Sequence, residues 1–212
     1  MSATTPSHAA GSKQPALWLA LAVALALSFA VDGPVMALVK PLHDSRVPDL
    51  IHATIRWLGT GYVQIPVAVI MIAAGALWSV RLKRAGGWAL LAFIISGAAV
   101  NILKLLVHRA RPYTPDPRPD TWLGYVHNSA FQSFPSAESA TTFAVAFTLM
   151  GWYPALRWPL TVIALCVGVG RVLVGGHHPS DVMAGAILGV VVARLVSSWA
   201  NGPRREATNV SA

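Results

Sequence analysis

The sequence predicts an all-α integral membrane protein built as a six-helix bundle. Apolar residues make up 55% of the 212-residue chain and charged residues only 11%, whereas an ordinary soluble domain carries about 25% charged residues. The apolar residues gather into six segments of about 20 residues, the length that a bilayer core requires. Backbone groups in lipid must bond within their own segment, so we expect helices; no segment alternates like a strand of a membrane barrel.

The first span is predicted at about residues 15–39, after a disordered tail at 1–14. Its apolar run continues through Asp32 and Gly33. A cleaved signal peptide is the alternative, because the first apolar block is short enough for one. Against it, there is no clear cleavage site of small residues, and the apolar character resumes after Gly33.

Residues 46–59 differ from the spans because charged residues fall between apolar ones that recur at helical spacing. This pattern predicts an amphipathic helix. It either lies at the membrane interface or packs on the bundle as a loop helix.

The other five spans are predicted at about 61–80, 87–107, 134–153, 158–175 and 179–199. The six spans form one domain over residues 15–200, followed by a tail at 201–212. In the last span, Gly185 and Gly189 form a motif that allows close helix packing, either within the bundle or between two copies of the chain.

Charges in the short loops predict the orientation. Six cations lie between spans two and three, between spans four and five, and after span six: Arg81, Lys83, Arg84, Arg157, Arg204 and Arg205. The positive-inside rule places them, and both tails, in the cytoplasm of a multi-pass inner-membrane protein. The loop 108–133 and the connector near 176–178 then share the outer face. Arginines in the outer loops oppose this rule, so either the topology is inverted or these arginines serve another purpose.

Polar residues cluster where three of the spans begin or end. Lys104 and Arg111 lie seven positions apart and therefore share one helical face, and Pro112 predicts that the helix ends near Arg111. These two cations either bind an anion or snorkel to lipid headgroups. At the start of span four, backbone N–H groups and the Ser136 hydroxyl form a ready anion site.

The third cluster precedes span six, where Pro179 predicts a helix start. His177 then lies at the mouth of the helix, and Asp181 can reach one imidazole nitrogen and leave the other free to attack. With Arg171 nearby, this arrangement suits a nucleophile for phosphoryl transfer. The alternative is a capped helix with a structural contact between His177 and Asp181.

Together these segments resemble the type 2 phosphatidic acid phosphatase (PAP2) superfamily, whose motifs are K-x6-R-P, P-S-G-H and S-R-x5-H-x3-D. Residues 104–112 match the first motif completely. Arg171, His177 and Asp181 match the third in every spacing, with Gly170 where the family usually has serine. The motifs cover roughly residues 90–195, and the six-span layout extends the resemblance to most of the chain.

The resemblance implies a PAP2-like fold and a membrane lipid phosphatase, and the predicted topology places its site at the outer face. His177 would form a phosphohistidine and Asp181 would orient it. The phosphate would be bound by Lys104, Arg111, Ser136, Ala137 and Arg171. No metal or other cofactor is implied, because cations and dipoles supply the charge, and the sequence lacks a carboxylate cluster suited to Mg²⁺.

The second motif departs from the family, since it reads Pro-Ser-Ala-Glu. Glu138 stands where the family has a histidine thought to protonate the leaving oxygen, and a glutamate can do so only with a raised pKa. Three hypotheses follow. Glu138 is the catalytic acid, or His178, His127 or His108 replaces it, or the leaving group needs little help, as with a pyrophosphate or a sugar 1-phosphate. An acid in the first turn of a helix also interacts well with the helix dipole.

Two alternatives to a lipid phosphatase remain: a phosphotransferase that passes the phosphate to another lipid, and a catalytically impaired binder of lipid phosphates. A transporter would need polar groups near the bilayer midplane, whereas the ionisable residues cluster at helix ends. Despite a net charge of +8, we expect no nucleic-acid partner, because the basic residues are not interleaved with aromatic ones on a polar surface.

Overall fold

The computed structural model describes residues 13–45, 49, 57–114 and 121–202. This part of the chain is helical and contains no strand. The predicted tails lie almost entirely outside it, although the first helix already begins at Lys13. Most of the helix predicted at 46–59 also lies outside the described residues; the short helix α3 (Trp57–Gly59) falls at its end.

The long helices follow the predicted spans. They are α1 (Lys13–His43), α4 (Gly61–Trp78), α5 (Val80–Val107), α7 (Ala137–Trp152), α8 (Arg157–Leu173) and α9 (Pro179–Asn201). Between them lie α6 (Trp122–His127), η2 (Ser129–Phe131) and η3 (Pro154–Leu156).

Five of the described helices are long and apolar enough to cross a membrane, whereas six spans were predicted. The exception is α7, which has 16 residues because the chain before Ala137 is not yet helical. It packs against α5, α8 and α9. Half of its 16 residues are buried, so α7 is largely enclosed by other helices.

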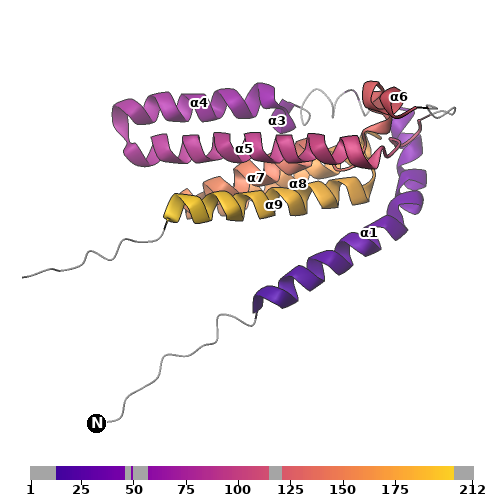
Figure 1. Ribbon diagram of the computed structural model, residues 1–212, viewed down its shortest axis with the longest axis horizontal. Helices are drawn as coiled ribbons and strands as arrows, with labels where there is room; N and C mark the ends of the chain where they lie inside the picture. The colour runs from indigo at the N-terminus through magenta and orange to yellow at the C-terminus, as the bar shows by residue number, and fades with distance from the viewer. Residues whose placement is uncertain (1–12, 46–48, 50–56, 115–120, 203–212) are drawn as a thin grey trace, which may run out of the picture.

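The helices form one bundle with a hairpin of α4 and α5 along one side (Figure 1). Below it lie α7, α8 and α9, and the loops gather with α6 at one end. The bent helix α1 meets the bundle at that end and diverges from it toward its N-terminus (Figure 1). It contains Pro34 and Pro41, each of which removes a backbone hydrogen bond and favours bending.

Small residues allow α7 and α9 to approach closely. A side chain added at Gly185 would place its Cβ 2.5 Å from the Ser136 carbonyl oxygen, and one at Gly189 would place it 2.4 Å from that of Ala140. The glycine motif therefore packs helices within the bundle, which is one of the two predicted alternatives. Large apolar side chains such as Leu77 and Leu106 are exposed outward, as a lipid environment requires.

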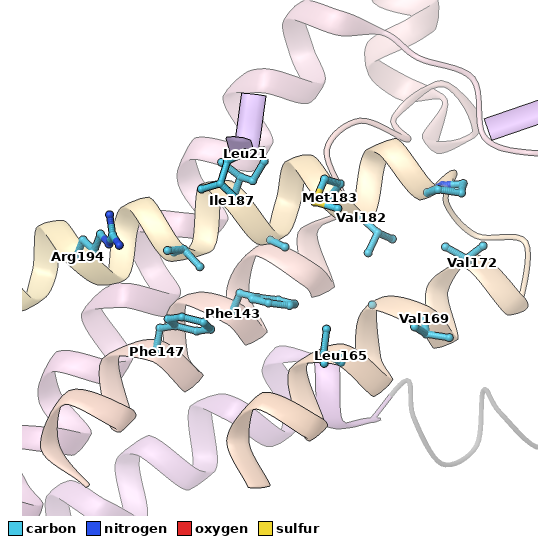
Figure 2. A pocket seen from close by; sticks show the side chains of 14 residues that line it. Leu21, Phe143, Phe147, Leu165, Val169, Val172, Val182, Met183, Ile187 and Arg194 are labelled. Carbon is cyan, nitrogen blue, oxygen red and sulfur yellow. The ribbon is translucent and has the colours of Figure 1, made fainter. Parts of the chain in front are cut away.

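An apolar cavity of about 540 Å³ opens where α1 diverges from the bundle (Figure 2). Leu21 lines it from α1, Phe143 and Phe147 from α7, Val169 from α8 and Ile187 from α9 (Figure 2). The N-terminal half of α1 still contacts α9, because the Arg194 guanidinium lies over the Trp18 ring at 4.9 Å. The hydrogen bonds that join α1 to other described segments lie in its C-terminal half, at Asp32, Met36 and His43.

Candidate active site

Backbone hydrogen bonds join the three polar segments at the end of the bundle where α6 lies. The Arg111 amide donates to the Ala130 carbonyl at 2.7 Å, and the Ser133 amide donates to the Arg109 carbonyl at 2.9 Å. The Ser136 amide donates to the Asp181 carbonyl at 3.0 Å. The loop after α5, the start of α7 and the start of α9 are thereby held as one unit.

His177 is fully buried at the centre of this unit. Its Nδ1 lies 2.8 Å from the Ser133 carbonyl oxygen. A carbonyl oxygen can only accept, so Nδ1 carries the proton, and Nε2 of the neutral ring keeps its lone pair. Nε2 lies 3.5 Å from Oε2 of Glu138, which is long for a hydrogen bond, and it makes none with any other described residue.

Asp181 does not hold His177 in the way the spacing predicted. Its Oδ2 lies 3.7 Å from Nδ1 of His177, beyond hydrogen-bond distance, because the Ser133 carbonyl occupies that position. Asp181 acts on the same serine, whose hydroxyl donates to Oδ2 at 2.5 Å. It also accepts from the His178 amide at 2.8 Å, in a capping box that begins α9. Asp181 is thus connected to the imidazole through Ser133.

Glu138 and Arg171 face Nε2 of His177 from two helices. Nη2 of Arg171, near the end of α8, lies 3.4 Å from Oε1 of Glu138, in the first turn of α7. The Arg171 side chain is buried against the backbone of Gly176, where an added Cβ would come within 2.7 Å of Nη2. The glycine therefore makes room for the Arg171 guanidinium.

Arg111 reaches the site by a route that differs from the predicted shared helical face. The helix ends at Val107, and His108 is left-handed with φ 48°, so Arg111 lies beyond α5. Its Nη1 donates to the Gly176 carbonyl at 3.0 Å and its Nε to the Ser129 carbonyl at 2.9 Å. The chain therefore delivers Arg111 from a loop that is bonded to the His177 segment.

The other predicted phosphate-binding residues lie at helix ends. Lys104 is in the last turn of α5, where it interacts electrostatically with Glu138, Arg111 and Arg171. Ser136 is the N-cap of α7 and its hydroxyl oxygen accepts from the Ser139 amide. Ala137 is the first residue of α7, where a backbone N–H has no carbonyl partner within the helix. Lys104 thus interacts with both arginines and with Glu138, the residue whose carboxylate lies 3.5 Å from Nε2 of His177.

The three histidines proposed as alternatives to Glu138 make their contacts elsewhere. His127 Nδ1 lies 2.8 Å from the Leu123 carbonyl of its own helix. The His108 ring packs against Trp122 and Tyr125. His178 is half-buried, with Nδ1 3.2 Å from Asp181 Oδ2. Among the described residues, Glu138 is therefore the titratable group that contacts Nε2 of His177.

The sequence did not predict a group of residues that bond to Asp181 or to one another beside His177. They are Asp32, Arg109, Ser133 and Ser180. Arg109 Nη2 lies 2.6 Å from Asp32 and its Nη1 lies 2.6 Å from Asp181. One signal was available: Asp32 is an acid within a predicted span, and such residues are usually paired and functional. The described residues contain no group of three or more His, Cys, Asp or Glu side chains placed to hold a metal ion.

The sequence and the fold are similar to those of known proteins. The family model described as the PAP2 superfamily matches residues 85–205. The chain is 37% identical over 107 residues to a lipid A 1-phosphatase of Rhizobium johnstonii, a match that covers 49% of this chain and 43% of that protein. It is 30% identical over 182 residues to a lipid A 1-phosphatase of Rhizobium etli, covering 78% of this chain and 76% of the relative.

A solved structure supports the same grouping. The PAP2-type phosphatidylglycerolphosphate phosphatase of Bacillus subtilis superposes with a TM-score of 0.67 and 26% sequence identity. The superposition covers 90% of this chain and 97% of that one.

Proposed function

The chain belongs to the PAP2 superfamily of membrane lipid phosphatases, and we propose that it hydrolyses a lipid phosphate monoester or pyrophosphate through a phosphohistidine on His177. One observation carries the proposal. The Ser133 carbonyl holds the proton on Nδ1 at 2.8 Å, so the lone pair on Nε2 faces the side where Glu138, Arg171 and Lys104 gather. A nucleophile whose free nitrogen faces converging cations suits attack on a phosphate.

The first step transfers the phosphoryl group to the enzyme. Nε2 of His177 attacks the phosphorus atom, a P–N bond forms, and the P–O bond to the lipid breaks with its electrons on the leaving oxygen. Arg171, Arg111 and Lys104 neutralise charge on the phosphoryl oxygens. The ring becomes cationic, and the Ser133 carbonyl at Nδ1 and the Asp181 carboxylate at 3.7 Å stabilise it.

The second step regenerates the enzyme. Water attacks the phosphorus, the P–N bond breaks, and inorganic phosphate leaves while Nε2 recovers its lone pair. Glu138 is the group placed to take the water proton, since its Oε2 lies 3.5 Å from Nε2. The carboxyl protonated in this way would donate its proton to the leaving oxygen in the first step of the next turnover.

The position of Glu138 favours substrates with good leaving groups. The carboxylate lies 3.4 Å from the Arg171 guanidinium, and this cation stabilises the ionised form, which is a poor acid. A lipid pyrophosphate or a sugar 1-phosphate releases a more stable anion than a simple alkoxide and needs less protonation. The lipid A 1-phosphatases to which the chain is similar are named for the release of a 1-phosphate, which agrees with a sugar 1-phosphate as substrate.

The test compares the wild type with His177→Ala on a panel of lipid phosphates in a chelating buffer. We expect phosphate release by the wild type, none by His177→Ala, and full release by the matched control His127→Ala, whose ring bonds its own helix. A ³²P-labelled wild type should carry acid-labile, base-stable label on the His177 peptide. Equal release by wild type and His177→Ala would exclude His177 as the nucleophile. Transfer to a second lipid without phosphate release would identify a phosphotransferase.

We further propose that the site faces the outside of an inner membrane, with both tails in the cytoplasm. Arg81 bonds the Trp152 carbonyl and packs on the Tyr153 ring, so the cationic turn between α4 and α5 meets the end of α7. These elements lie at the end of the bundle away from α6 (Figure 1). A reporter fused after Arg205 should be cytoplasmic, and a periplasmic signal would reverse this orientation.

A further inference from the structure

Asp32 is an acidic residue in the middle of an apolar helix. Its side chain is buried, with 6% of the residue exposed. Burial of a carboxylate is costly unless it is paired and hydrogen-bonded, and both of its oxygens have partners. Oδ1 accepts from the Ser180 amide at 2.9 Å, and Oδ2 accepts from the Ser180 hydroxyl and from Arg109. Asp32 thus binds the first turn of α9.

Arg109 connects Asp32 to Asp181. Its Nη2 lies 2.6 Å from Asp32, and its Nη1 lies 2.6 Å from Oδ1 of Asp181 and from the Ser180 hydroxyl. Phe29, one turn before Asp32 on α1, covers the guanidinium at 5.1 Å and packs on Phe134. Two carboxylates, from α1 and α9, therefore share the partly buried guanidinium of Arg109.

The network continues from Asp181 to the imidazole. Oδ2 of Asp181 accepts from the Ser133 hydroxyl, and the Ser133 carbonyl accepts from Nδ1 of His177. The hydroxyl and the carbonyl of Ser133 thus connect Asp181 to the imidazole ring, which Asp32 itself does not contact.

The C-terminal half of α1 also contacts both loops of the site. The Tyr113 hydroxyl donates to the Met36 carbonyl at 2.6 Å, and His43 Nδ1 lies 3.1 Å from the Val174 carbonyl. Farther toward the N-terminus, Leu21 lies across the apolar cavity from α8 (Figure 2). In addition to these contacts, the hydrogen bonds of Asp32 bind α1 to the first turn of α9, which follows His177.

We propose that Asp32 is a positioning residue, which acts through Arg109, Asp181 and Ser133 to aim Nε2 of His177 at the phosphorus atom. The proposal rests on the proposed function. Because the network from Asp32 reaches the imidazole at Nδ1 and not at the attacking Nε2, its loss alters the attack angle and leaves phosphate binding intact. A misplacement of about 1 Å costs on the order of 100-fold in rate.

The test uses Asp32→Asn, which keeps the shape and removes the charge that pairs with Arg109. The matched control is Ser28→Ala, one turn earlier on α1, where the buried hydroxyl bonds only the Leu25 carbonyl of its own helix among the described residues. We expect kcat of Asp32→Asn to fall about 10- to 100-fold, with KM and inhibition by inorganic phosphate within about twofold of the wild type. Asp32→Glu should recover part of kcat, and the control should match the wild type.

A second readout does not depend on turnover. Buried His177 should react slowly with diethyl pyrocarbonate in the wild type and several-fold faster in Asp32→Asn, as measured by mass spectrometry of its peptide. If the wild type releases no phosphate, the proposed function fails and this readout alone decides the role of Asp32. An unchanged kcat together with unchanged His177 reactivity would overturn the proposal, as would a raised KM at constant kcat.

Discussion

Oε2 of Glu138 lies 3.5 Å from Nε2 of His177, while Oε1 of the same carboxylate lies 3.4 Å from Nη2 of Arg171. The carboxylate therefore bridges His177, the proposed nucleophile, and Arg171, a proposed phosphate ligand. In the proposed mechanism two phosphoryl oxygens take this position, and the substrate displaces the carboxylate from Arg171. The same group can then protonate the leaving oxygen or accept a proton from water.

Glu138→Gln tests two effects of the carboxylate separately: its exchange of a proton with the substrate or water, and its competition with phosphate for Arg171. Without a proton to exchange, we expect kcat on a lipid monoester to fall about 100- to 10,000-fold, the usual contribution of a general acid or base. The loss should be smaller on a lipid pyrophosphate, whose leaving group needs less help. Inorganic phosphate should inhibit the variant more strongly, because the negative charge beside Arg171 is gone. Full activity of the variant on every substrate would exclude Glu138 as acid or base.

Glu138→His should widen the range of substrates. An imidazolium in the first turn of α7 is an acid near neutral pH and does not repel the phosphate. We expect a gain in kcat/KM on phosphatidic acid relative to the wild type, with little change on a pyrophosphate. The assay compares both substrates in the same detergent. If the variant is inactive on both substrates while its thermal denaturation curve shows that it is folded, the leaving group does not explain the presence of Glu138.

Gly176→Ala should impair phosphate binding without unfolding the protein. The new Cβ would lie 2.7 Å from Nη2 of Arg171, and the flexible end of that side chain can move away. A displaced guanidinium no longer faces the phosphoryl oxygens, so kcat/KM should fall about 10- to 100-fold and inhibition by phosphate should weaken. Gly97→Ala is the control, since its Cβ would meet only Thr141, at 4.0 Å. Equal kinetics of the two variants would show that Arg171 does not need this space.

The long helices were predictable because lipid imposes both length and apolar composition on a span. The ends of α1 and α7 were less so. α1 begins at Lys13 and ends at His43, beyond the apolar run, because its C-terminal turns are held by contacts with other segments. α7 begins later than its predicted span. The backbone before it makes hydrogen bonds with other segments instead: the Ser133 carbonyl with His177, and the Ser136 amide with the Asp181 carbonyl.

Motif spacing selected the proposed catalytic and phosphate-binding residues, but it did not predict the hydrogen bonds that connect them. The partner of His177 Nδ1 is a backbone carbonyl, which any residue type at position 133 would offer. The ion pair between Asp32 and Arg109 spans 77 positions, and only the rarity of an acid within a span indicated that Asp32 had a partner. Sequence spacing identifies side chains with chemistry, whereas the bonds that aim them depend on the fold.

Gly189→Ala tests the close contact between α7 and α9 that holds both halves of the site. Its Cβ would lie 2.4 Å from the Ala140 carbonyl oxygen and 2.8 Å from the Ala144 amide nitrogen. Neither backbone atom can move without shifting a helix. Overpacking of this kind costs about 1–3 kcal/mol, so the thermal midpoint should fall by about 2–10 °C for a chain of this size.

Gly87→Ala on α5 is the matched control, because no atom lies within 4 Å of its added Cβ. Alanine is the better helix former by up to about 1 kcal/mol, so this variant should keep or raise the midpoint in the same detergent. Because α9 begins with the segment that binds His177, Gly189→Ala should also lower kcat at temperatures where it remains folded. A midpoint equal to that of Gly87→Ala would contradict the tight α7–α9 packing.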